Sequence, residues 1–194
     1  MPHPNTITLA CLFAWLTFET FWDLRDHRIP VWFSLVMLLP GLVWLTISIS
    51  PWPAVLVAVS LAFTELVRRT LAGIVGIFAP LLLTAILFHP LMPLAVGWAF
   101  LVFLWSFGIL GGADALAGLA LLSFFPSWAM VAAILAGTLA WSLALLWVRY
   151  RKDAGLRLWA VLSSRATGER QAGLGAYALA ALFYGLGRLC LGIQ

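Results

Sequence analysis

The sequence predicts an all-α protein: a bundle of about eight membrane-spanning helices with its N-terminus outside. Of its 194 residues, 64% are hydrophobic and 9% are charged, whereas soluble domains are nearer half apolar and a quarter charged. Mean hydropathy is +1.06. A soluble globule this small shows much of its surface to water, and eleven basic and seven acidic side chains cannot cover it. This composition excludes a soluble enzyme, a secreted disulfide scaffold, a disordered chain and a sizeable domain outside the membrane.

Apolar runs separated by prolines or charges define the predicted spans, since a spanning helix needs about 20 apolar residues. In chain order they are Ile7–Trp22, Val31–Ser50, Pro53–Val67, Thr70–Phe88, Leu91–Leu110, Ala115–Phe125, Ser127–Val148 and Gly173–Gln194. Prolines, which end or kink helices, mark the links at 51–53, 89–90 and 126. The run 115–125 is too short to cross alone. It either begins in a thinned or water-filled region or forms a half-span, so six to eight spans are expected.

Basic residues predict the orientation. Ten of the eleven Lys and Arg residues fall in the links 23–30, 68–69 and 149–172, and cytoplasmic loops are enriched in such residues. No Lys or Arg precedes the first run, the reverse of a cleavable signal. We therefore expect one domain over 1–194 in the cell membrane. Its basic cytoplasmic loop at 149–172 is expected to include a short surface helix around Leu158 and Trp159.

Several kinds of site are excluded. Cys11 and Cys190 form no C-x-x-C pair, so we interpret them as packing residues rather than a zinc or redox site. The sequence contains no H-E-x-x-H spacing and no Gly-rich phosphate loop. We expect no metal and no cofactor. Topology accounts for the net charge of +4, so no nucleic-acid partner is expected.

Asp114 is the most informative acidic residue. It follows Gly111 and Gly112, and no Lys or Arg lies within thirty positions of it. An ionisable group at membrane depth is costly and by default suggests a function. The two glycines remove side-chain bulk and would let another chain approach. The alternative is that Asp114 caps a helix over 115–125, with Gly112 in the preceding turn. The two interpretations are equally supported and mutually compatible.

Asp23 ends the first predicted span at the same inner boundary as Asp114. Its simplest interpretation is a charge paired with Arg25 or Arg28. Two carboxylates at one depth could instead meet in a shallow, wet site, where proximity separates the pKa values of the two groups. One then holds a proton while the other is ionised, as an aspartyl hydrolase requires. Glu19 lies on the same helical face as Asp23 and could adjust its proton affinity or belong to a proton path.

Two separated stretches resemble motifs of the type IV prepilin peptidases, including the archaeal preflagellin peptidases, which are GxGD-type intramembrane aspartyl peptidases. The segment 23–30 reads DLRDHRIP and is similar to D-x-(K/R)-x-x-(K/R)-(I/V)-P-N. The segment 107–116 reads FGILGGADAL and is similar to G-x-G-D-x-K, closer still to a G-G-A-D-A form of archaeal-type members. With the spans between them, the resemblance covers most of the chain.

The resemblance implies that Asp23 and Asp114 are the catalytic pair. The residues that would shape the site or bind substrate are Gly111, Gly112, Arg25, Arg28 and Glu19. The implied reaction is hydrolysis of the peptide bond between a short basic leader and the hydrophobic helix of a pilin-like or archaellin-like precursor. It would occur at the cytoplasmic face without a metal or organic cofactor.

Three residues depart from the family pattern. Val31 replaces the usual Asn, and Ala113 replaces the second Gly of G-x-G-D. Leu116 replaces the usual Lys, which removes a cation that could steady an ionised Asp114. Bifunctional relatives methylate the new N-terminus with an extra N-terminal region. Only a few residues precede the first span here, so no methyltransferase activity is expected.

Two other functions fit parts of the pattern. In a proton- or cation-coupled transporter, the ion-pathway residues would be Glu19, Asp23, Glu65 and Asp114. The absence of evident inverted repeats counts against this function. A non-catalytic pilin-assembly protein would keep the fold and bind pilin helices, and Leu116 is its main support.

Overall fold

The computed structural model is all-α, as predicted. It describes residues 6–26, 31–67, 71–106, 110–152 and 175–191. Over these ranges the chain forms eight α-helices and one short 3-10 helix. In order they are α1 (Thr6–Asp26), α2 (Val31–Ser48), α3 (Pro51–Val67), α4 (Leu71–Leu87), η1 (His89–Leu91), α5 (Met92–Ser106), α6 (Gly112–Phe124), α7 (Trp128–Lys152) and α9 (Gly175–Leu191). Within the described part of the chain, no helix combines the length and apolar character needed to cross a membrane.

Each predicted span overlaps one helix, but two helices continue past the charged residues predicted to end them. Helix α1 runs to Asp26 rather than Trp22, and α7 runs to Lys152 rather than Val148. Arg and Lys are good helix formers, and cations are favourable near a helix C-terminus. The first basic residues of the predicted loop 149–172 therefore belong to α7. The surface helix predicted within that loop lies outside the described residues.

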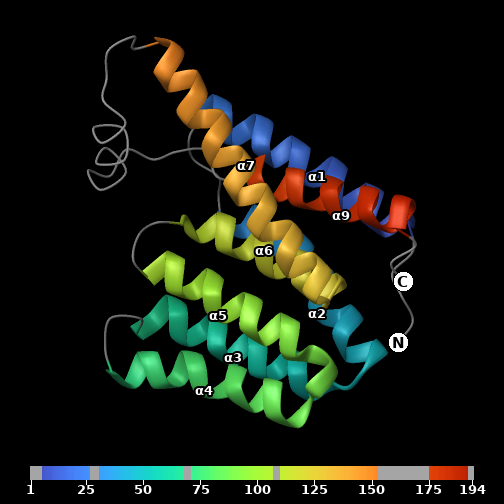
Figure 1. The fold of residues 1–194 in the computed structure, drawn as a ribbon. Coiled ribbons are helices and arrows are strands. Elements are labelled where there is room, and N and C mark those ends of the chain that lie inside the picture. Colours follow the sequence, from blue (N-terminus) through green and yellow to red (C-terminus); the bar gives the residue numbers. More distant parts are fainter. Residues whose placement is uncertain (1–5, 27–30, 68–70, 107–109, 153–174, 192–194) are drawn as a thin grey trace.

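The helices pack as two groups. Helices α2, α3, α4, α5 and α6 form a closed circuit in which each packs against two neighbours. The second group is α1, α9 and α7, with α9 packed between the other two. In Figure 1, α3, α4 and α5 occupy the lower part of the view and α1, α9 and α7 the upper part, with α6 between the groups.

Successive helices alternate in direction. Helices α1, α3, α5 and α7 end, and α2, α4, α6 and α9 begin, toward the left of the bundle in Figure 1. The other helix termini lie toward the right of the view, together with η1. This alternation brings the last turn of α1 and the first turn of α6 to the same end of the bundle.

Helix α6 is the most enclosed element. Every residue from Asp114 to Phe125 is buried. Small residues allow the close packing, because a Cβ added at Gly41 of α2 would lie 2.9 Å from Ser123 Cβ, and one at Gly97 of α5 would lie 2.7 Å from Leu122 Cδ1. A helix of 13 residues is only about 20 Å long, so α6 is covered by its neighbours along almost its full length.

Candidate functional site

Asp114 lies in the first turn of α6, with its carboxylate turned back toward the start of the helix. The backbone N–H of Gly111 donates a hydrogen bond to Asp114 Oδ2 at 3.1 Å. Gly111 is the residue before the helix and has extended backbone angles. The sequence alternative in which Asp114 precedes a helix at 115 is therefore wrong in register, because α6 begins at Gly112. The carboxylate still caps the helix, and the helix N-terminus favours its negative charge.

The two glycines before Asp114 leave little room for larger residues. A Cβ at Gly111 would lie 3.0 Å from Asp114 Oδ2. One at Gly112 would lie 3.0 Å from Trp105 Cζ2, and Trp105 is itself buried. Asp114 retains 9% exposure, while Gly111 is exposed. The carboxylate is thus largely enclosed on the α5 side and borders an open backbone segment at Gly111.

Tyr177 is a neighbour of Asp114 that the sequence analysis missed. It comes from α9, and its ring lies against Gly118, where a Cβ would be 2.8 Å from Tyr177 Cε1. Gly118 is one helical turn from Asp114 on the same face of α6. The Tyr177 hydroxyl is buried and has no hydrogen-bond partner among the described residues. The sequence feature that could have indicated this neighbour is the tyrosine itself, one of three in the chain, in a largely apolar stretch.

Glu19 is the second buried carboxylate in the described part of the chain. It lies on α1, is 0% exposed, and its Oε1 accepts a hydrogen bond from Ser34 Oγ of α2 at 3.2 Å. Aromatic side chains of the two helices pack nearby, with Trp15 and Phe33 stacked at 6.3 Å between ring centroids. Glu19 therefore links α1 to α2, a role that the sequence pattern did not indicate.

The remaining predicted site residues are at the end of α1 and in the link after it. Asp23 and Arg25 belong by their backbone to the last turn of α1. Their side chains, and the whole of Arg28, lie outside the described residues. Helix α1 ends, and α6 begins, at the same end of the bundle (Figure 1).

Leu116 occupies the position at which the resembling family usually has Lys. It is 1% exposed and belongs to the core of the bundle. Burying an ammonium group there would be costly without a partner. The apolar surroundings of this position therefore suit the Leu that the sequence carries.

No family model, curated protein or solved structure matches this chain.

The arrangement around Asp114 suits proton transfer. A carboxylate held by a backbone N–H and a helix N-terminus, with limited access at one side, can accept a proton from a water molecule. No group of three or more His, Cys, Asp or Glu residues able to hold a metal occurs in the described ranges.

Proposed function

We propose that this chain is a membrane-embedded aspartyl endopeptidase of the prepilin type, with Asp23 and Asp114 as its catalytic pair. It would remove a short basic leader from a pilin-like or archaellin-like precursor. The observation that carries the proposal is the buried Asp114 carboxylate at the start of the enclosed helix α6. It lies at the end of the bundle where α1 carries Asp23 in its last turn.

Exposed apolar side chains support membrane embedding. Large hydrophobic residues face outward on the described helices, for example Ile47 at 76%, Ile86 at 63% and Leu189 at 77% exposure. Helices α2, α4 and α5 contain no charged residue. Extended apolar surface of this kind is typical of membrane or protein contact. The support is the chemistry of the surface and the composition rather than the length of the helices.

The basic residues support a cytoplasmic position for the site. Arg149, Arg151 and Lys152 lie in the last turn of α7, at the end of the bundle where α6 begins (Figure 1). Excess Lys and Arg favours the cytoplasmic side of a membrane. A peptidase acting on a precursor before export would need its site at this face.

The proposed chemistry uses the two carboxyl groups in different protonation states. The helix N-terminus and the Gly111 N–H stabilise negative charge on Asp114, so Asp114 is the group that takes a proton from water. The resulting hydroxide attacks the scissile carbonyl carbon while protonated Asp23 donates a proton to the carbonyl oxygen. Collapse of the tetrahedral intermediate breaks the C–N bond. The leaving amine takes the proton from Asp114, and Asp23 recovers its own.

Cleavage of a leader-bearing precursor tests the proposal. Purified protein in proteoliposomes should shorten a pilin-like precursor by the mass of its leader, as read by mass spectrometry. Asp114→Asn and Asp23→Asn should each abolish cleavage, because an amide cannot exchange the required proton. Asp26→Asn is the matched control, since Asp26 is in the same helical turn as Asp23 but is not assigned a role.

The outcomes separate the alternatives. Unchanged cleavage by either catalytic variant, with helicity retained by circular dichroism, would overturn the aspartyl mechanism. A wild-type protein that binds the precursor without cutting it would favour the pilin-assembly function. Proton or cation flux into the same proteoliposomes that Asp114→Asn removes would favour the transporter.

A further inference from the structure

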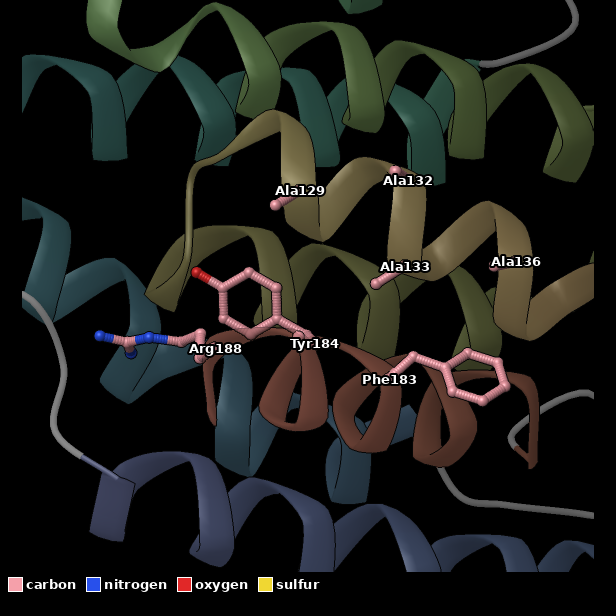
Figure 2. A pocket seen from close by; sticks show the side chains of 8 residues that line it. Ala129, Ala132, Ala133, Ala136, Phe183, Tyr184 and Arg188 are labelled. Atoms are coloured by element: carbon pink, nitrogen blue, oxygen red, sulfur yellow. The ribbon is translucent and has the colours of Figure 1, made fainter. Parts of the chain in front are cut away.

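A groove lies on the surface between α7 and α9. Its volume is about 370 Å³. One wall consists of the small side chains of α7 from Ala129 to Ala136, and the other includes Phe183, Tyr184 and Arg188 of α9. Figure 2 shows Ala129 beside the Tyr184–Arg188 end and Ala136 beside Phe183. The groove therefore has a polar end and an apolar end.

The apolar end of the groove is closed by a contact between backbones. Gly137 follows Ala136, and a Cβ at Gly137 would collide with the carbonyl oxygen of Ala176 and lie 2.8 Å from the Ala180 nitrogen. Helices α7 and α9 thus touch at Gly137. The groove therefore ends at Gly137, and a flexible chain lying in it would end there.

The polar end of the groove carries a cation and hydroxyl groups. Arg188 lies in the last turn of α9, and Tyr184 Oη accepts a hydrogen bond from Ser127 Oγ at 3.5 Å. Arg188 is the one Lys or Arg residue that the sequence places outside the cytoplasmic links. Helix α9 ends, and α7 begins, at the end of the bundle opposite the first turn of α6 (Figure 1).

The groove is shorter than the hydrocarbon layer of one membrane leaflet. Ala136 lies seven positions after Ala129, a rise of about 10 Å along the helix. The hydrocarbon core of a bilayer is about 30 Å thick, so a leaflet is longer than the groove. A molecule that fits has an anionic head at Arg188 and an apolar tail that runs about 10 Å inward along the alanines.

We propose that the α7–α9 groove binds one anionic phospholipid of the outer leaflet, with its phosphate at Arg188 and an acyl chain along Ala129–Ala136. The binding rests on the membrane embedding in the proposed function but not on peptidase activity. Arginine is the side chain best suited to phosphate, because its planar guanidinium donates two parallel hydrogen bonds. The alanines contribute contact with the acyl chain and no competing polar group.

Native mass spectrometry of the full-length protein in detergent tests the site. Phosphatidylglycerol and phosphatidylcholine with the same acyl chains are titrated separately and the bound lipid is counted. We expect wild type to retain one phosphatidylglycerol in preference to phosphatidylcholine. Arg188→Gln should weaken phosphatidylglycerol binding about tenfold, the effect of losing one charge-assisted contact. Arg188→Lys keeps the charge but loses the paired hydrogen bonds, so its preference should lie between those of wild type and Arg188→Gln. Arg151→Gln, in the last turn of α7, is the matched control.

A second variant tests the acyl-chain wall. Ala136 lines the groove and is exposed, so Ala136→Leu should fill the groove and weaken binding of both lipids while Arg188 is unchanged. Equal phosphatidylglycerol binding by wild type and Arg188→Gln, or by wild type and Ala136→Leu, would overturn the proposal. If Ala136→Leu instead alters only self-association, the groove receives a helix and the lipid site is wrong. Cleavage by the same preparations is read separately, so an inactive protein that binds the lipid refutes the peptidase and not the groove.

Discussion

Replacement of Gly118 by alanine tests how closely α6 is enclosed. A Cβ at this position would lie 2.6 Å from Leu101 Cδ1 and 2.8 Å from Tyr177 Cε1. Carbon atoms pack best at about 3.5–4.0 Å, so both neighbours would have to move. Leu101 and Tyr177 are themselves buried, at 2% and 1% exposure, and have little space to move into. Overpacking of this kind costs about 1–3 kcal/mol.

Gly187→Ala provides the matched control for that cost. Gly187 also lies in a helix, and no heavy atom of the described residues approaches within 4 Å of its Cβ position. Both replacements gain the same intrinsic helix propensity, about 1 kcal/mol. The difference in free energy of unfolding between the two variants therefore isolates the steric cost at Gly118.

The measurement is unfolding of each variant from dodecylmaltoside micelles by added SDS, followed by helical circular dichroism. We expect the free energy of unfolding of Gly118→Ala to be lower than that of Gly187→Ala by about 1–3 kcal/mol. Equal values for the two variants would refute the close packing of α6 against α5 and α9. A lower free energy of unfolding for Gly187→Ala alone would also contradict the structure, because the close contacts lie at Gly118 and not at Gly187.

Three further predictions use the same unfolding measurement. Ser60→Ala should lower the free energy of unfolding by about 1 kcal/mol, because the buried Trp98 Nε1–H donates to Ser60 Oγ at 3.1 Å; no change would mean that the indole finds another acceptor. Ser34→Ala should cost about 1–2 kcal/mol, because it removes the hydroxyl that donates to Glu19 Oε1, and Ser34→Thr should restore part of the loss. Tyr177→Phe should instead raise the free energy of unfolding by about 1 kcal/mol, because its hydroxyl is buried without a hydrogen-bond partner in the described part of the chain; a fall would indicate that the hydroxyl is bonded in the folded state.

The sequence predicted the order of the α-helices in the described part of the chain because breakers and apolar runs are local signals. Proline marked the links near 51, 90 and 126, and helices end close to each of them. The charged residues after Trp22 and Val148 predict links, whereas α1 continues to Asp26 and α7 to Lys152. Arg and Lys continue a helix readily, so a charge change alone does not locate a helix end.

The surroundings of the two buried carboxylates were harder to predict. Asp114 was identified because a carboxylate is conspicuous in an apolar run. Tyr177 and Ser34 were missed because their roles depend on contacts between helices, Tyr177 of α9 with α6 at Gly118 and Ser34 of α2 with Glu19 of α1. A glycine such as Gly118 admits a close neighbour but does not indicate in sequence which one.

The enclosure of α6 has a consequence for how the protein is made. Helix α6 leaves the ribosome before α9, yet the Tyr177 ring of α9 covers the surface of α6 at Gly118. Until α9 is synthesised and docks, the first half of α6 and the Asp114 carboxylate lack one of their covering walls. Completion of the C-terminal helix is therefore the step that closes the bundle. A nascent chain that stops before Gly175 would leave this part of the interior uncovered.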